Sequence, residues 1–192
     1  MEAEENKKTS NLGPSSSKRF AIKLDQICTP ERLVNPKVLR SVIELAIEIA
    51  REGREGRKIG TMFVVGDDQA VLSRSKELIL DPLYRHALSN KYITDPSMQE
   101  TIKELAQLDG AFIVSDKGFV LSAARYIETN SKGIDLPLGL GSRHLAAASI
   151  SRQTKAVAVV VSESSIVRIV DDGKIIAEII PELWLIGRTS SK

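Results

Sequence analysis

The chain has 192 residues, and 42% of them are hydrophobic, which is enough for one compact domain with a sizeable core. Its 27 basic and 25 acidic residues leave a net charge of +2. This near balance argues against a large nucleic-acid-binding surface, so we expect no nucleic acid partner. Any anion that the protein binds must be held by a local site.

The single cysteine, Cys28, excludes an intrachain disulfide framework and fits a reducing compartment. The apolar run from Ala156 to Val161 is closed by Lys155 and Ser162, well short of the roughly 18 to 20 residues that a membrane-spanning helix needs. The N-terminus also lacks the apolar stretch of a secretion signal. These features predict a cytoplasmic protein with no membrane partner.

The chain divides into two expected parts, a disordered N-terminal tail over residues 1–20 and a single domain over residues 21–192. The tail is rich in Glu, Lys, Asn and Ser and has almost nothing to bury. No internal repeat is visible in the domain. The segment 67–92 is weakly periodic, so its structure is left open, although Asp81-Pro82 indicates a turn or a helix start.

Three helices are expected in the domain. Apolar residues recur at helical spacing from Pro36 to Ala50, and glycines that follow would end this helix. Asp95-Pro96-Ser97 predicts a second helix start, with an apolar stripe that reaches Leu108. The third helix follows a glycine-bearing loop, runs along Leu145–Ser151, and has Ser142 as its expected N-cap.

Short apolar runs bounded by turn residues predict strands between these helices. Asp116-Lys117 and Asp171-Asp172-Gly173 are short polar turns that predict two hairpins. Helices and strands are intermixed, so the expected fold is α/β, with a mixed β-sheet core surrounded by α-helices. The strands are expected at Ile59–Gly66, Ala111–Ser115, Gly118–Ala124, Ala156–Val161, Ile166–Val170 and Lys174–Ile179, and Trp184 is expected to pack on the body.

The first candidate site is Asp109-Gly110-Ala111, where an amphipathic helix gives way to an apolar strand. A carboxylate at such a junction lies at the rim of a sheet, where it can bind a divalent cation, and the small Gly110 and Ala111 let a substrate approach the backbone. Taken alone, these residues are more typical of an aspartate in an ordinary turn.

The second candidate site runs from Gly139 to His144 and leads into a helix. Free backbone N–H groups and the helix dipole suit phosphate there, Ser142 adds a hydroxyl, and Arg143 can hold two phosphate oxygens. The alternative is that Ser142 only caps the helix, Arg143 is solvated and His144 makes a structural hydrogen bond. The clustering of Gly, Ser, Arg and His favours phosphate.

Two further residues are weaker candidates. Ser162-Glu163 comes directly after the carboxyl end of an apolar strand, where mixed and parallel sheets often bind their ligands. Taken alone, the pair is typical of a polar turn. Tyr126 offers a flat face to a nucleobase and is equally compatible with a half-buried core position.

In their order and spacing, four segments together resemble the diadenylate cyclase domain family. The resemblance covers roughly Val38 to Ile180, and its two central motifs are jointly specific. The segments are Asp109-Gly110-Ala111, Ala123-Ala124-Arg125-Tyr126, Leu138-Gly139-Leu140-Gly141-Ser142-Arg143-His144-Leu145-Ala146-Ala147 and Val161-Ser162-Glu163.

The resemblance implies a mixed β-sheet fold, ATP as substrate, Mg²⁺ or Mn²⁺ as cofactor, and cyclic di-AMP with pyrophosphate as products. It implies that Asp109 serves the metal and the attacking hydroxyl, and that Glu163 is a second metal-side carboxylate. It places Tyr126 beside the adenine. The residues that it assigns to the phosphates are Gly141, Ser142, Arg143 and His144.

Leu145 departs from the family pattern, which often reads Arg-His-Arg at this point. The leucine removes a cation that would neutralise triphosphate. Members that look archaeal share it, so we interpret it as a feature of that branch. The alternative is a non-catalytic module that senses ATP or a cyclic dinucleotide; a nucleic-acid-linked regulator is disfavoured by the charge balance.

The implied reaction needs the ribose 3′-hydroxyl of one ATP to attack the α-phosphate of another, twice. A metal would lower the pKa of that hydroxyl, and Arg143 with the helix N-terminus would stabilise the leaving pyrophosphate. Two ATP molecules related by twofold symmetry require two facing half-sites. We therefore expect a homodimer or higher oligomer for catalysis.

Overall fold

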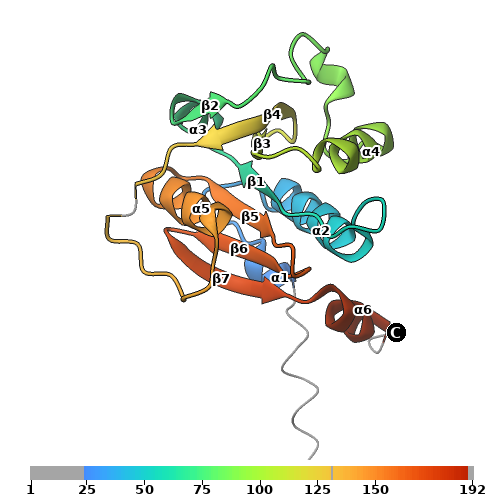
Figure 1. The fold of residues 1–192 in the computed structure, drawn as a ribbon, viewed down its shortest axis with the longest axis vertical. Coiled ribbons are helices and arrows are strands. Elements are labelled where there is room, and N and C mark those ends of the chain that lie inside the picture. The colour runs from blue at the N-terminus through green and yellow to red at the C-terminus, as the bar shows by residue number, and fades with distance from the viewer. Residues whose placement is uncertain (1–23, 131, 190–192) are drawn as a thin grey trace, which may run out of the picture.

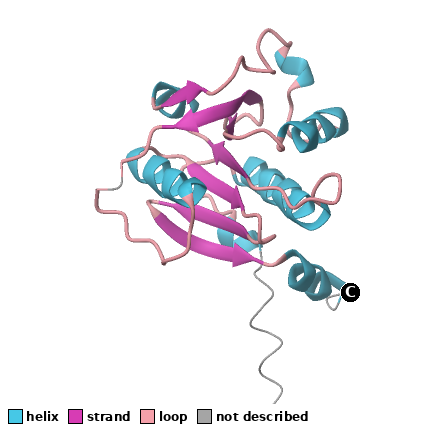
Figure 2. Cartoon of the chain, viewed as in Figure 1, coloured by secondary structure: helices cyan, strands magenta, loops and turns pink. Residues whose placement is uncertain are grey.

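The computed structural model describes residues 24–130 and 132–189, and Figures 1 and 2 show their arrangement. The helices are α1 (Leu24–Ile27), α2 (Pro36–Glu52), α3 (Asp68–Ser73), the 3-10 helix η2 (Leu88–Asn90), α4 (Pro96–Leu105), α5 (Ser142–Gln153) and α6 (Pro181–Thr189). The strands are β1 (Thr61–Val65), β2 (Ser75–Glu77), β3 (Ala111–Val114), β4 (Val120–Ile127), β5 (Val157–Val161), β6 (Val167–Asp171) and β7 (Lys174–Ile179).

The strands form one seven-stranded sheet in the order β2-β4-β3-β1-β5-β6-β7. Strands β1 and β3 pair in parallel, and every other neighbouring pair is antiparallel. The sheet is therefore mixed. The predicted α/β class, with a mixed sheet surrounded by helices, is confirmed, as Figure 1 shows.

Helices cover both faces of the sheet (Figure 2). On one face, α1, α2, α4 and α6 enclose the larger core, to which β1 contributes Phe63 and Val65. On the other face, α3 and α5 cover a smaller core that includes Met62 and Val64 of the same strand. Because successive side chains of a strand point to opposite faces, an entirely apolar β1 supplies both cores.

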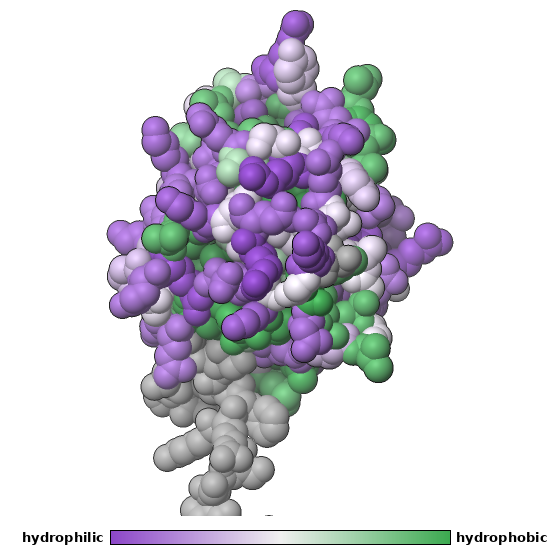
Figure 3. All heavy atoms as spheres, turned by 90° about the vertical axis from the view of Figure 1, so that its left-hand side faces the viewer, coloured by the Kyte–Doolittle hydropathy of each residue, from purple (hydrophilic) through white to green (hydrophobic). Residues whose placement is uncertain are grey.

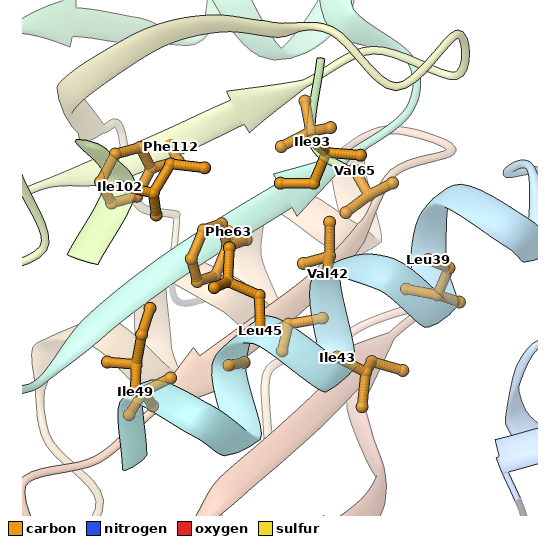
Figure 4. Close-up of a cluster of buried hydrophobic side chains, with 14 of the residues drawn as sticks. Leu39, Val42, Ile43, Leu45, Ile49, Phe63, Val65, Ile93, Ile102 and Phe112 are labelled. Atoms are coloured by element: carbon orange, nitrogen blue, oxygen red, sulfur yellow. The ribbon is translucent and has the colours of Figure 1, made fainter. Parts of the chain in front are cut away.

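The larger core depends on α2, which lies across the sheet (Figure 4). Leu45 of α2 packs beside Phe63, whose ring stacks on Phe112 of β3 with centroids 5.1 Å apart. Burying each such side chain contributes about 1.5–3 kcal/mol. Asn35 caps the helix by accepting a hydrogen bond from the Lys37 backbone N–H, 3.0 Å from donor to acceptor.

Most of the predicted elements are present. The first helix, the second helix with its Asp95 cap, and the strands that became β1 and β3 to β7 are confirmed. Both predicted hairpins are also found, and Trp184 packs against the larger core. The predicted N-cap Ser142 is wrong, because Gly141 holds that position and Ser142 is the first helical residue.

The sequence did not predict α1, α3, β2, η2 or α6, all of which are short or lie in the segment left open. Asp81-Pro82 starts a turn rather than a helix. The expected tail, residues 1–20, lies outside the described residues. Within the described part of the chain, no helix is long and apolar enough to cross a membrane.

Candidate functional site

The predicted site residues meet at one edge of the sheet. Cα pairing places Met62 opposite Ala111, and Ala111 opposite Arg125, while Thr61 pairs with Val161 on the other side. The site is therefore bounded by the amino ends of the parallel strands β1 and β3 and by the carboxyl ends of β4 and β5. The start of α5 lies against this same edge.

Arg143, the second residue of α5, joins the two carboxylates that the sequence singled out. Its Nη2 donates to Oδ1 of Asp109 over 3.1 Å, and its Nη1 lies 3.5 Å from Oε1 of Glu163. Both carboxylates are open to solvent, since the side chains of Asp109 and Glu163 are 79% and 73% exposed. Ion pairs of such exposed groups contribute roughly 0–1 kcal/mol, so a stronger anionic ligand can displace either carboxylate.

Gly60 makes room for this guanidinium just before β1. A Cβ built at Gly60 would lie 2.8 Å from Nη1 of Arg143 and 3.1 Å from Cγ of Glu163. Only glycine avoids this overlap without moving the two side chains. Gly60 thus controls how closely Arg143 and Glu163 approach the sheet edge.

Gly110 is fixed by the neighbouring strand. Its φ of 106° lies in the region that favours glycine, and a Cβ there would lie 2.7 Å from the carbonyl carbon of Ala124. Opposite it, β4 bulges, because Ala111 pairs with Arg125 while Ile113 pairs with Ser122. Such bulges are frequent beside functional sites, where they change the direction of neighbouring side chains.

The start of α5 offers unpaired backbone donors. Gly141 caps the helix without any side-chain hydrogen bond, and the first backbone bond of the helix runs from His144 N to Gly141 O over 3.0 Å. The N–H groups of Ser142 and Arg143 therefore have no partner in the described chain, as expected at a helix start. These N–H groups and the helix dipole together suit an anion.

Two hollows meet at this helix start. The first, which we call the Tyr126 pocket, has a volume of about 160 Å³ and apolar walls that include Leu145 and Met62. Tyr126 is 49% exposed, so it lines an open hollow and is not a core residue. The pocket's lining also contains Asp109, Gly110, Ser142 and Arg143.

The second hollow, which we call the Glu163 pocket, has a volume of about 370 Å³. Most of the residues that line it are polar or charged, and they come from the glycine loop, the start of α5, the turn after β5 and β6. It shares Ser142 and Arg143 with the Tyr126 pocket, so one helix start borders an apolar and a polar hollow. The other polar residues of its lining are His144, Ser162, Glu163, Ser164 and Arg168.

His144 is buried and held by a neighbouring strand. Its Nε2 lies 3.1 Å from Nη1 of Arg168, whose Nε donates to Oε1 of Glu178 over 2.9 Å. Arginine can only donate, so Nε2 of His144 is the acceptor and Nδ1 carries the ring proton. Burial, with the positive charge of Arg168, lowers the pKa of His144 below its usual value of 6.5. The imidazole is therefore neutral at neutral pH.

The structure brings all but one of the predicted site residues to these two hollows. The exception is Ala111, which is fully buried in β3 and lines neither. Gly60 and Arg168 also lie at the site and were not among the predicted residues. Arg168 could have been singled out from the sequence, because a charged residue inside an apolar strand normally has a specific partner. The sequence around Gly60 gives no such indication, because the side chains that require a glycine there are distant in sequence.

The residues at the edge can be tested against the expected divalent cation. No group of three or more His, Cys, Asp or Glu side chains that could hold a metal ion exists among the described residues. The carboxylates available to a metal are those of Asp109 and Glu163, which flank the same guanidinium. Mg²⁺ is usually held by one or two carboxylates together with substrate phosphates and water, so the pair fits Mg²⁺ if substrate supplies the remaining ligands.

A mixed α/β sheet with an uncapped helix start and an apolar pocket beside it has the geometry that suits a nucleotide. The sequence model of the DAC family, described as "DisA bacterial checkpoint controller nucleotide-binding", matches residues 48–175. The chain belongs to this family.

Two curated relatives are diadenylate cyclases. The protein from Methanocaldococcus jannaschii is 52% identical over 146 residues, which cover 76% of this chain and 46% of the relative. The protein from Haloferax volcanii is 43% identical over 151 residues, which cover 78% of this chain and 55% of the relative. The chain thus spans about half the length of these curated relatives.

Solved structures show the same fold at lower identity. A double mutant of DacA from Staphylococcus aureus aligns with a TM-score of 0.52 and 23% identity, over 80% of this chain and 94% of that chain. A hypothetical membrane spanning protein from Bacillus cereus aligns with a TM-score of 0.54 and 19% identity, over 72% of this chain and 62% of that chain. At these identities the likeness concerns the fold alone.

Proposed function

We propose that this protein is a diadenylate cyclase, which condenses two ATP molecules into cyclic di-AMP and releases two pyrophosphates. The observation that carries the proposal is Arg143, placed between Asp109 and Glu163 at the junction of an apolar and a polar pocket. The two curated relatives, both diadenylate cyclases at 43% identity or more, support the same activity.

In this proposal the Tyr126 pocket receives the adenosine part of ATP. Tyr126 provides a ring face for the adenine, while Leu145 and Met62 supply apolar contacts. Asp109 lines the same pocket, and in this proposal its carboxylate lies near the ribose. We therefore expect the ribose 3′-hydroxyl next to the carboxylate of Asp109, which accepts its proton.

The triphosphate extends from this pocket over the start of α5. The free N–H groups of Ser142 and Arg143 and the guanidinium of Arg143 bind phosphate oxygens. To do so, Arg143 leaves one or both carboxylates, which exchange a guanidinium for the cation that accompanies ATP. A bound Mg²⁺ or Mn²⁺ would supply positive charge to the attacking hydroxyl and to the phosphate oxygens.

Each condensation forms one bond from a ribose 3′-oxygen to an α-phosphorus and breaks the bond between the α- and β-phosphates. The hydroxyl proton passes to Asp109, and the bonding electrons leave with pyrophosphate. His144 is neutral and fixed by Arg168, so it serves this step as a hydrogen-bond donor or a structural support and not as a cation. Since the substrate is ATP, we assign the reaction to the cytoplasm.

Each ATP must supply both an attacking 3′-hydroxyl and an attacked α-phosphate, so the reaction needs two facing sites. Two copies of the chain provide them. The site is open enough for a second copy, as the exposed Asp109, Glu163 and Tyr126 side chains indicate. On the side of the molecule that faces the reader in Figure 3, hydrophilic side chains predominate and hydrophobic ones gather in smaller areas. Because the product joins two ATP molecules and the site is open to solvent, we propose a homodimer or higher oligomer, which brings two half-sites face to face.

The test is to incubate the purified chain with ATP and either Mn²⁺ or Mg²⁺ and to analyse the products by mass spectrometry. We expect cyclic di-AMP and pyrophosphate in a ratio of about one to two. ATP binding without any cyclic product would instead support the sensing module. A dilution series adds a second criterion, because activity of an obligate dimer rises faster than linearly with enzyme concentration. Turnover proportional to concentration down to the monomer would contradict the facing half-sites.

A further inference from the structure

A third hollow borders the site on the side of α2 and β1. It has a volume of about 200 Å³, and we call it the basic pocket. It shares Arg143 and Glu163 with the Glu163 pocket, so the two adjoin at these side chains. The other charged residues of its lining are Arg54, Arg57 and Lys58, from the turn between α2 and β1.

The turn that carries these cations has a defined backbone. Arg54 N donates to Arg57 O over 2.9 Å, and Arg57 N donates to Arg54 O over 2.8 Å. Glu55 and Gly56, between them, have positive φ values of 49° and 74°, as in the turns that close tight hairpins. The Arg54 side chain is further held by an ion pair with Glu104. The cations therefore project from a fixed loop.

The basic pocket has more positive charge than its acidic neighbours neutralise. Arg57 and Lys58 are exposed, and neither forms an ion pair with any acidic residue in the described ranges. Glu163 is the one carboxylate in the lining, and it already faces Arg143. Moreover, Nε of Arg143 is buried and has no hydrogen-bond partner among the described residues. Unneutralised cations converging on a hollow favour an anion there.

The position of the basic pocket beside the Tyr126 pocket favours the phosphates of a nucleotide as its anion. The apolar Tyr126 pocket contains Asp109 and Arg143, whereas the basic pocket contains Arg143 and lacks Asp109. Because both hollows share Arg143, a nucleotide whose adenosine occupies the first and whose α-phosphate meets Arg143 can extend its remaining phosphates into the second. Leu145 lines the Tyr126 pocket and carries no charge, whereas the turn before β1 supplies Arg57 and Lys58 to a hollow that adjoins Arg143.

We propose that Arg57 and Lys58 form a subsite for the β- and γ-phosphates of ATP, which then holds the pyrophosphate as it leaves. This inference rests on the proposed function for the position of the nucleotide. Positive charge at this place stabilises the charge that grows on pyrophosphate when the bond to the α-phosphate breaks. Arg57 and Lys58 thus bind the phosphates of the substrate and stabilise the leaving pyrophosphate, and neither belongs to a motif that the sequence indicated.

The experiment compares a variant with a matched control. Arg57→Ala/Lys58→Ala removes two exposed cations beyond the end of α2, and Lys37→Ala/Lys117→Ala removes two exposed lysines near the start of α2, at the far end of that helix. Both changes lower the net charge equally. Titration calorimetry at fixed ionic strength gives dissociation constants for pyrophosphate, ATP and AMP with each protein.

We expect Arg57→Ala/Lys58→Ala to weaken pyrophosphate and ATP binding by about tenfold or more and to change AMP binding by less than about twofold. The control should bind all three ligands as the unmodified protein does. Equal binding of ATP and pyrophosphate by both variants, or an equal loss for AMP, overturns the subsite. A folding check by circular dichroism accompanies each variant, and Arg57→Gln/Lys58→Gln, which keeps the bulk, must show the same pattern.

The two proposals fail separately. If the unmodified protein makes cyclic di-AMP while the variant binds ATP normally, the function stands and the subsite is wrong. If no cyclic product forms but ATP and pyrophosphate binding depend on Arg57 and Lys58, the subsite stands and the cyclase function is wrong.

Discussion

Arg143 donates a hydrogen bond to Asp109 over 3.1 Å and so connects the start of α5 with the loop before β3. The same guanidinium faces Glu163 after β5, at 3.5 Å. One cation thus faces two carboxylates, one just before β3 and one just after β5, and this trio keeps a net negative charge when no ligand is bound. Any ligand that binds to Asp109 or Glu163 must compete with Arg143, which links phosphate binding to release of the carboxylates.

The first prediction concerns Asp109→Asn. The amide has nearly the same shape and can still accept the hydrogen bond from the Gly110 backbone N–H at 2.9 Å, but it binds metal poorly and cannot take up a proton. We expect cyclic di-AMP formation to fall by roughly 10²- to 10⁴-fold. ATP affinity should be largely kept, and mass spectrometry with calorimetry measures both.

The matched control for Asp109→Asn is Asp172→Asn. Asp172 is exposed in the turn between β6 and β7 with φ of 46°, a conformation that asparagine tolerates. This variant should retain full activity. An Asp109→Asn protein as active as this control would show that the carboxylate has no part in the reaction.

The second prediction concerns Gly60→Ala. A Cβ there would lie 2.8 Å from Nη1 of Arg143, so the guanidinium must move. Because a misplacement of about 1 Å can reduce a rate by about 10²-fold, we expect turnover to fall by roughly tenfold to a hundredfold. The melting temperature should fall only slightly, since overpacking of this size costs about 1 kcal/mol.

A double-mutant cycle checks the cause of the Gly60→Ala effect. In an Arg143→Ala background the new methyl group no longer meets a guanidinium, so Gly60→Ala should cost less stability than it does alone. Identical costs in both backgrounds would place the strain elsewhere, for instance at Glu163 Cγ, which the Cβ would approach to 3.1 Å.

The third prediction concerns Leu145, which lines the apolar pocket beside Tyr126. Leu145→Ala should weaken the binding of both ATP and AMP by about tenfold, because it removes apolar contact with the nucleoside. Leu145→Met conserves volume and serves as the control. Leu145→Arg should not raise kcat/KM, since a guanidinium there faces Met62 and Tyr126 rather than the basic pocket; a clear gain in turnover would refute this assignment.

The fourth prediction concerns the pH dependence of stability. Burial and the charge of Arg168 lower the folded-state pKa of His144 below 6.5, while Glu178 opposes the shift. At a pH about one unit or more above 6.5 the imidazole is neutral in both states and contributes almost no pH dependence. As the pH falls below that value, the unfolded chain binds a proton that the folded protein does not, so stability is lost.

Urea unfolding between about pH 7.5 and pH 5 measures this effect. The unmodified protein should lose more stability over this range than His144→Gln, in which the group is absent. His86→Gln is the control, because the second of the two histidines is exposed. Parallel pH profiles for the unmodified protein and His144→Gln would exclude a neutral, buried His144.

The sequence by itself determined the longer helices, most of the strands and the identity of the candidate side chains. The periodicity that predicted α2 and the alternation of apolar runs with short turns in β3 to β7 are local patterns, and local patterns specify such elements directly. The grouping of Gly139 to His144 before a helix also indicated an anion site without any knowledge of distant residues.

Only the tertiary structure decided which of these residues meet. The segment 67–92 has little local periodicity, and β2 exists within it because β4 offers an edge to pair with. In the same way, Arg143 lies between Asp109 and Glu163, and Gly60 must be glycine, because β1, β3 and β5 pair side by side. Contacts between residues far apart in sequence depend on sheet pairing and on burial of α2 and α5, and no short stretch of sequence encodes them.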